Sequence, residues 1–373
     1  APPKAPGLSD GPNIIMGGGF FPVTEPLSRT NCPSGTRLPK QRSPLESETH
    51  VTKPASAAAA NSAAAPSPSS ESAPLAQRLA DAYRAVRDET ERRAAPLSAE
   101  DQLIQSMPDA SPAKWHRAHT TWFFEQFLLG EHVKGYTPLH PDYAYLFNSY
   151  YVSAGPRHAR HQRGHLTRPT ADEVTAYRRH VDAEVVKFFR TATPEKLEAL
   201  VPLVEVGLNH EQQHQELLVT DIKHAFWCNP LAPAYHTLPA ADVRGAAPLR
   251  WLAREESICE IGHPGWPGAA GFAYDNESPR HRVLVPAHAL ASRPVSNAEF
   301  GEFIADGGYR TPGVWLSAGW ARVQADGWVR PLYWNDDATR EFTLAGWRAL
   351  GDDGRARVMA ELPLRRERMD DVG

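Results

Sequence analysis

The sequence has little cysteine, no long apolar run and no large excess of charge of either sign. Its three cysteines (Cys32, Cys228 and Cys259) are far apart and form no C-x-x-C pair. This argues against a disulfide framework and a cysteine-built zinc site, and is typical of a reducing compartment. No apolar run approaches the roughly 20 residues that cross a bilayer. A formal charge of −4 gives no electrostatic basis for binding nucleic acid or an anionic membrane. We therefore expect a cytoplasmic enzyme with neither partner.

The composition and residue pattern of the sequence change three times along its 373 residues. Residues 1–74 are rich in Pro, Ser, Ala and Gly without a sustained apolar period, which predicts a disordered low-complexity tail. Residues 75–235 show helical spacing of apolar side chains. Residues 245–350 contain short strand-like pieces with many Gly, Pro and Trp residues. Residues 351–373 form a charged tail without aromatic residues.

Four stretches within 75–235 predict long amphipathic helices. The third begins with a capping box from Thr170 to Glu173, and Pro202 is expected to divide the fourth from the residues before it. One long connection joins otherwise closely spaced helices, which indicates a four-helix bundle, a usual place for metal sites. The predicted helices cover 75–93, 111–132, 168–190 and 203–227.

Residues 245–350 predict a separate α+β domain with much loop. A short helix begins at a second capping box, Ser296 to Glu299, and ends at Gly307 and Gly308. The expected fold class is therefore multidomain, α followed by α+β.

The stretch "GLNHEQQHQELLV" contains a candidate metal motif. His210 and His214 lie about 40° apart on one face of a helix, one turn apart, so both imidazoles can reach one ion. His119 in "WHRAHTTWFFEQF" offers a third imidazole from another helix of the bundle. Three neutral imidazoles leave about half of an octahedral iron open, whereas zinc favours four-coordination and hydrolysis. Residue types alone do not choose between these metals.

H-E-x-x-H is also the motif of zinc proteases, in which Glu211 would be the general base. A zinc hydrolase needs a further ligand downstream. His224 is the one close candidate, and its position around the helix is unfavourable. A bundle that binds a metal without catalysis is a third interpretation.

Several long motifs resemble one enzyme family. "SPAKWHRAHTTWFFEQFLL", "LFNSYY", "RHARHQRGHLTRPTADEVTAYRRHVD" and "NHEQQHQELLVTDIKHAF" resemble the DinB-like domain of the ergothioneine-biosynthesis sulfoxide synthases. The segment from "FAYDNESPRHRVLVP" to "PLYW" resembles the first part of their formylglycine-generating-enzyme (sulfatase-modifying factor) domain, which has a C-type-lectin-like fold. The resemblance runs from about Leu75 to Leu350, in the order of the family.

This resemblance implies a mononuclear non-haem Fe(II) enzyme. Such an enzyme uses O2 to join the sulfur of cysteine or γ-glutamylcysteine to the imidazole C2 of hercynine, leaving a sulfoxide. A selenium donor, giving a selenoneine-type C–Se synthase, is an open alternative. By position, His119, His210 and His214 match the iron ligands of the family.

The resemblance also implies the residues that hold the substrates. Gln213 matches a residue that contacts the hercynine imidazole. Arg160 and Arg163 resemble the pair that binds the carboxylate of the thiol substrate, a task that suits guanidinium donors. Tyr150 and Tyr151 resemble tyrosines that donate a proton beside the metal. The sequence gives no basis for choosing between the two.

The chain departs from the family after "FTLAGWRAL". The second domain of the family continues with further core and hercynine contacts, whereas residues 351–373 match none of these. We expect a truncated or frame-shifted end, a partial second domain with poorly covered tryptophans (Trp315, Trp320, Trp328 and Trp334), and impaired turnover.

Overall fold

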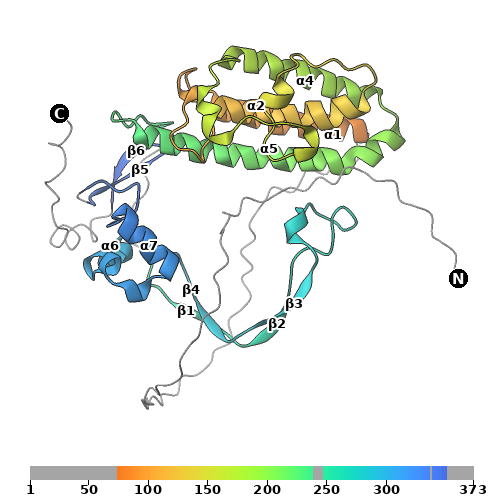
Figure 1. Ribbon diagram of the computed structural model, residues 1–373. Helices are drawn as coiled ribbons and strands as arrows, with labels where there is room; N and C mark the ends of the chain where they lie inside the picture. Colours follow the sequence, from red (N-terminus) through yellow and green to blue (C-terminus); the bar gives the residue numbers. More distant parts are fainter. Residues whose placement is uncertain (1–73, 238–246, 337, 351–373) are drawn as a thin grey trace, which may run out of the picture. The chain divides into compact units, whose positions relative to one another are not determined.

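The computed structural model describes residues 74–237, 247–336 and 338–350 of the chain (Figure 1). The predictions for residues 1–73 and 351–373 therefore lie outside the described residues. None of the helices within the described ranges is long and apolar enough to cross a membrane.

Four long helices run alongside one another in the helical region, as Figure 1 shows. Helices α1 and α2 both pack on α5, and α4 packs on α1 and α2. Short helical pieces connect them along the chain. The helices are α1 (Leu75–Ala94), α2 (Ala113–Phe123), α3 (Tyr143–Leu146), α4 (Ala171–Thr191) and α5 (Pro194–Cys228). The short pieces are η1 (Asp101–Leu103), the π-helical turn η2 (Phe124–Gly130) that continues α2, η3 (Val152–Ala154) and η4 (Arg160–His165).

Local sequence signals set the helix starts. The predicted capping box of α4 is confirmed: the Thr170 hydroxyl accepts from the Glu173 amide, and the Glu173 carboxylate accepts from the Thr170 amide. Helix α5 begins with Thr193 as its cap and with Pro194 in its first turn, where the missing N–H costs nothing.

The prediction that Pro202 divides the fourth helix is wrong. Helix α5 runs unbroken for 35 residues with Pro202 inside it. An interior proline costs a helix about 3 kcal/mol. Here Leu200 and Val204, on either side of Pro202, are both buried in the bundle core. Burial of the two flanking segments in one core offsets that cost, because each large aliphatic side chain contributes about 1.5–3 kcal/mol.

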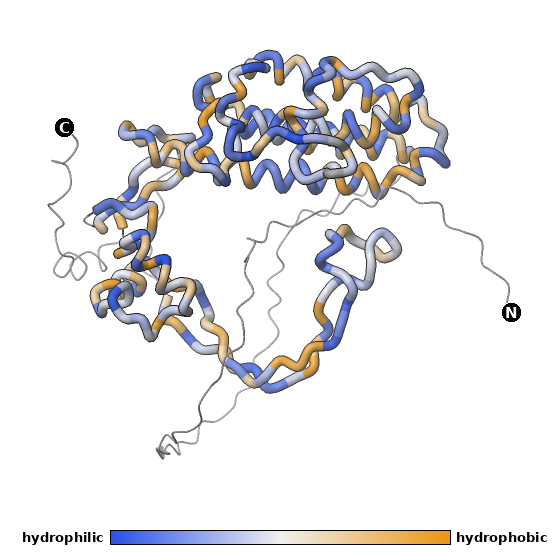
Figure 2. The backbone as a smooth tube through the Cα atoms, in the orientation of Figure 1, coloured by the Kyte–Doolittle hydropathy of each residue, from blue (hydrophilic) through white to orange (hydrophobic). Residues whose placement is uncertain are grey.

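The bundle core lies between the four helices, and apolar and polar residues alternate along each of them (Figure 2). Gly207 of α5 permits a close approach of helices within it. A Cβ atom at Gly207 would lie 2.6 Å from the Phe124 ring and 2.9 Å from the Phe123 ring. Since His210 lies one turn further along α5, this close approach brings α5 and the α2–η2 helix together beside His210.

A small region with strands follows the bundle in the chain, so the predicted combination of α and α+β structure is confirmed. Its strands pair as three antiparallel two-stranded sheets: β1 (Trp251–Arg254) with β4 (His288–Ala291), β2 (Ser257–Ile261) with β3 (His281–Val285), and β5 (Arg340–Thr343) with β6 (Gly346–Ala349). The helical pieces are η5 (Asp275–Glu277), α6 (Asn297–Ala305), η6 (Gly308–Arg310), η7 (Pro312–Val314) and α7 (Ser317–Asp326).

Helix α6 begins at the predicted capping box of Ser296 and Glu299, and the chain leaves it through Gly307, whose φ of 83° favours glycine. The expectation of poorly covered tryptophans holds for Trp328, which is 43 % exposed, and is wrong for Trp334. The Trp334 side chain is buried in a small cluster with Ile304 and Ala338.

Candidate metal centre

Three histidines from two helices meet in the bundle. His119 of α2 and His210 and His214 of α5 each offer one ring nitrogen, and these nitrogens all lie within 4.8 Å of one another. The Nε2 atoms of His119 and His210 are 3.2 Å apart. Within the described ranges, this is the one group of three such residues placed to hold a metal ion. The structure thus brings together the three histidines that the sequence analysis singled out.

The His119 ring is fixed by its neighbours. It stacks between Trp115, at 4.6 Å between ring centroids, and Trp122, at 5.4 Å. The guanidinium carbon of Arg163 lies over the Trp115 ring, 3.4 Å from its centroid. The Nδ1 atom of His119 lies 2.5 Å from the carbonyl oxygen of Phe147. Because a carbonyl only accepts hydrogen bonds, Nδ1 carries the hydrogen, and the Nε2 of a neutral ring presents its lone pair to the other histidines.

Burial keeps all three rings neutral. It lowers the pKa of His119 and His214 well below the ordinary value, helped by the neighbouring histidines, and it lowers the pKa of His210 to about 4. Metal ligands must be unprotonated, so the three rings are in the binding form near neutral pH.

The donor set fits a divalent transition metal. Three neutral imidazoles converge on one point, and imidazole suits iron, zinc, copper and nickel. The His210 Nδ1 atom is buried without a hydrogen-bond partner among the described residues, so hydrogen bonds hold that ring from its Nε2 side alone. His210 therefore depends on a group at the Nε2 side for its orientation, which is the side that faces His119.

The two tyrosines that the sequence could not separate occupy different environments. The Tyr151 ring lies 6.4 Å from the His119 ring and 6.3 Å from the His210 ring, between centroids, and burial raises its pKa. Tyr150 is 55 % exposed, and its hydroxyl accepts a hydrogen bond from Arg160. Only Tyr151 thus borders the histidine cluster.

The predicted substrate arginines also differ from each other. Arg163 is buried, and its guanidinium donates to the hydroxyls of Ser111 and Ser149. Its Nε atom has no partner among the described residues. Burial, and Arg160 nearby, lower the pKa of Arg163 to about 9, which leaves it positively charged at neutral pH. Arg160 is exposed and donates to the Asp109 carbonyl. Gln213 is exposed on α5, one residue before His214.

Glu211, the general base of the zinc-protease interpretation, accepts hydrogen bonds at both of its carboxylate oxygens from other side chains. Its side chain is fully buried, with one oxygen accepting from Thr90 and Arg178 and the other from Arg87. Burial alone would raise its pKa, but the two guanidinium groups lower it to about 2. A carboxylate in this state is a poor base, since its oxygens are engaged by three side chains and a base must contact the proton that it removes.

His224, the further ligand that a zinc hydrolase would need, does not join the cluster. Its Nδ1 atom lies 2.7 Å from the Ser106 hydroxyl. The arrangement of Glu211 and His224 therefore argues against a hydrolase of the H-E-x-x-H type.

Sequence reasoning missed two residues next to the cluster. The Nδ1 atom of His116 lies 2.8 Å from Nδ1 of His214, and its Nε2 atom lies 3.0 Å from the carboxylate of Asp221. The spacing of His116 and His119, three residues apart on one helix, places both on the same face. That spacing was the available signal.

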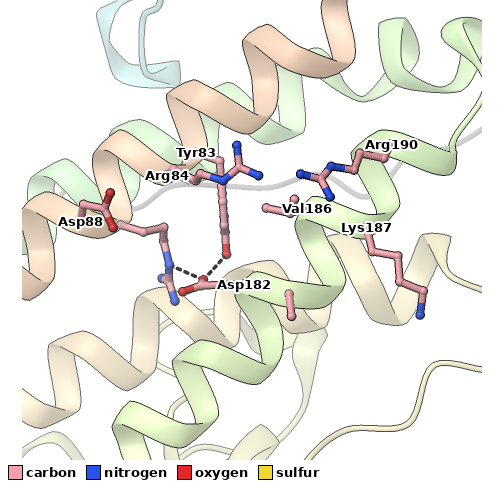
Figure 3. A pocket seen from close by; sticks show the side chains of 9 residues that line it. Tyr83, Arg84, Asp88, Asp182, Val186, Lys187 and Arg190 are labelled. Atoms are coloured by element: carbon pink, nitrogen blue, oxygen red, sulfur yellow. Dashed lines mark hydrogen bonds and ion pairs between the residues drawn. The ribbon is translucent and has the colours of Figure 1, made fainter.

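A surface pocket of about 480 Å³ lies between α1 and α4 (Figure 3). The hydroxyl of Tyr83 and the Nε of Arg87 both donate to Asp182 there. None of the three clustered histidines lines it. Arg87 extends from this pocket to Glu211, so the pocket floor is part of the ion-pair network that supports α5.

A helical bundle with inward-facing histidines from two of its helices defines the class of the site. Residues 82–218 match the family model described as the DinB superfamily. The helical region is therefore a DinB-type domain, and α2 and the histidine pair of α5 both lie within the matched residues.

Relatives in the wider comparison narrow the family. A protein of Mycolicibacterium smegmatis named hercynine oxygenase is 30 % identical over 246 residues, 63 % of this chain and 52 % of the relative. One of Mycolicibacterium thermoresistibile with the same name is 31 % identical over 262 residues, 62 % of this chain and 49 % of the relative. A hercynine oxygenase of Mycobacterium tuberculosis is 29 % identical over 160 residues, which are 41 % of this chain and 36 % of the relative. The chain is similar to these hercynine oxygenases and spans about half the length of the first two.

Proposed function

We propose that this chain carries the metal centre of an Fe(II)- and O2-dependent sulfoxide synthase of ergothioneine biosynthesis. The reaction joins the sulfur of cysteine or γ-glutamylcysteine to C2 of hercynine. One C–S bond forms as an S–H and a C–H bond break. One oxygen atom of O2 remains on sulfur as the sulfoxide, and the other leaves as water, so the four-electron oxidation of the substrates balances the reduction of O2.

The convergence of His119, His210 and His214 is the observation that carries this proposal. When bound, a ferrous ion held by three imidazoles supplies open coordination positions for O2 and a thiolate. The names of the relatives support an oxygenase over a hydrolase. The contacts of Glu211 support the same choice, because the carboxylate that would activate water in an H-E-x-x-H hydrolase is held by Arg87 and Thr90.

The residues around the centre support a small, charged substrate. Arg163 is a buried cation that donates its hydrogen bonds to the hydroxyls of Ser111 and Ser149, so a substrate carboxylate would supply an anionic partner for this guanidinium. Arg160 would contribute a second guanidinium from the same η4 turn. Gln213 would contact the hercynine imidazole from the exposed side of α5.

The test is an assay of the purified chain, loaded anaerobically with Fe(II) and mixed with hercynine, O2 and either cysteine or γ-glutamylcysteine. We expect a sulfoxide adduct by mass spectrometry with one of the two thiols, and no adduct from the zinc-loaded chain. A selenium donor tested in parallel distinguishes C–Se from C–S bond formation. Iron binding without any adduct would reduce the proposal to a metal-binding bundle, and peptide or ester hydrolysis by the zinc form would overturn it.

Tyr151 is expected to hold the proton that the reaction needs. Its hydroxyl stays protonated at neutral pH and its ring borders the histidines, so Tyr151→Phe removes a proton donor from the site. We expect Tyr151→Phe to lower the rate of sulfoxide formation by about 100-fold, a typical general-acid contribution, while oxidation of the thiol alone increases.

Tyr150→Phe is the matched control, since it removes the neighbouring hydroxyl outside the cluster. The ratio of sulfoxide to oxidised thiol in the two variants decides the assignment. An unchanged ratio in Tyr151→Phe would contradict it.

A further inference from the structure

A chain of hydrogen bonds connects His214 to a carboxylate through a fourth histidine. His116 of α2 is 3 % exposed and lies between the two groups. Its Nδ1 atom is 2.8 Å from Nδ1 of His214, and its Nε2 atom is 3.0 Å from Oδ2 of Asp221. The same Oδ2 atom accepts the backbone N–H of Ser111 at 2.8 Å, which fixes the carboxylate against the start of α2.

The chemistry of the carboxylate end determines the hydrogen positions along this chain. A carboxylate only accepts hydrogen bonds, so Nε2 of His116 carries a hydrogen and donates it to Asp221. Because the His116 ring is buried, its charged form is disfavoured. A neutral imidazole with a hydrogen on Nε2 has a lone pair on Nδ1. The short contact with His214 then requires the hydrogen to come from Nδ1 of His214.

We propose that His116 and Asp221 are positioning residues that hold His214 in the tautomer with its hydrogen on Nδ1, which leaves the Nε2 lone pair for a metal ion. The proposal rests on the metal site of the proposed function. It assigns a role to a His–Asp pair that itself lies outside the ligand set, and it accounts for a buried histidine that the reaction does not otherwise use.

The hydrogen-bonded chain from Asp221 through His116 to His214, here called the relay, resembles the arrangement that holds His119. There the Phe147 carbonyl accepts from Nδ1 and leaves Nε2 free, and here His116 accepts from Nδ1 of His214 with the same result. A hydrogen-bonded partner on the far nitrogen of a ligand histidine fixes its tautomer and its ring orientation, and raises its basicity. His116, the partner of His214, is itself hydrogen-bonded to the Asp221 carboxylate. The negative charge of Asp221 therefore acts on the His214 ring through two successive hydrogen bonds. His210 has no such partner among the described residues.

The first test reads the tautomer directly, without a metal. The full chain is labelled with 15N histidine, purified metal-free, and examined by two-bond 1H–15N correlation spectra at pH 7.5, with the His214 signals assigned through His214→Gln. We expect a protonated Nδ1 and a bare Nε2 at His214 in the wild type. A His214 ring with its hydrogen on Nε2 would overturn the proposal, and this reading does not depend on the folding of any variant.

The second test changes His116. His116→Leu removes the acceptor, whereas His116→Asn keeps a carbonyl oxygen near the place of Nδ1. We expect the affinity for Co²⁺, titrated by its visible absorption, to fall about 10–100-fold in His116→Leu and to recover in His116→Asn. His224→Asn is the control, because it removes a histidine of α5 whose hydrogen-bond partners, Ser106 and Cys228, lie outside the cluster.

The two tests separate the relay from the proposed function. If His214 shows the expected tautomer but the wild-type chain binds neither Co²⁺ nor Fe²⁺, the relay is real and the proposed function fails. If the wild type binds metal and His116→Leu folds, retains the tautomer and binds Co²⁺ as tightly, the relay is wrong and the proposed function stands. Equal losses in His116→Leu and His116→Asn indicate packing in place of hydrogen bonding, and also contradict the relay.

Discussion

Replacing Glu211 by glutamine should lower the free energy of unfolding by about 3–5 kcal/mol, the range for breaking one side of a buried ion pair. Glu211 is completely buried and receives hydrogen bonds from Arg87, Arg178 and Thr90. Glutamine fills the same space but removes the negative charge. Two buried guanidinium groups then face a neutral amide that offers an N–H donor where one carboxylate oxygen accepted.

The matched control is Glu89→Gln, the same chemical change on the surface of α1. Glu89 pairs with Arg92 and Arg93 one turn away, and its side chain is 30 % exposed. Exposed pairs of this kind contribute about 0–1 kcal/mol, so Glu89→Gln should change stability little. Urea unfolding of both variants, followed by circular dichroism, gives the comparison. Equal effects in the two variants would contradict the buried network as a determinant of stability.

The contribution of Glu211 to the free energy of unfolding should depend on pH. The pKa of Glu211 is about 2 in the folded chain and has an ordinary value near 4.5 when the side chain is free. A lowered pKa stabilises the fold above the ordinary value, and this stabilisation is lost as the pH falls toward the folded pKa. The stability difference between wild type and Glu211→Gln should therefore be constant above about pH 4.5 and shrink as the pH falls toward 2.

The helices were largely predictable because their signals are local. Thr170 and Glu173 satisfy each other's backbone within four residues, so the start of α4 is legible in the sequence. The continuity of α5 through Pro202 was not legible, since it depends on burial of Leu200 and Val204 against other helices. The π-helical turn after Phe123 was missed for the same reason, because no residue in "FEQFLLG" requires an extra residue in the turn.

Some features of the candidate site could likewise be predicted from the sequence, whereas others depend on the fold. The spacing of His210 and His214 and the aromatic surroundings of His119 indicated a cluster, which the structure brings together. The difference between Tyr150 and Tyr151 depends on how a loop after α3 enters the bundle, which adjacent residues in a sequence do not specify. Glu211 lies within the motif, but its partners are far away in the sequence on α1 and α4, so its role in ion pairing required the fold.

Substituting alanine for any one of His119, His210 or His214 should lower the affinity for Fe(II) by more than the roughly 10–100-fold that loss of an outer partner costs. Each removed imidazole takes away one of three converging donors and leaves two. Anaerobic equilibrium dialysis against Fe(II), read by metal analysis, measures the loss. Sulfoxide formation should disappear with the metal.

A second readout separates lost metal from lost fold. A metal that binds only the folded chain stabilises it by about 2.7 kcal/mol at 100 times its dissociation constant. Wild type should show this shift in thermal unfolding with Fe(II) or Co²⁺, and the three alanine variants should lack it while remaining helical. His224→Ala, the ligand that a zinc hydrolase would need, should retain the full shift. A triad variant that kept its metal would mean that the imidazoles of α2 and α5 do not share an ion, and the proposed function would then lose its basis.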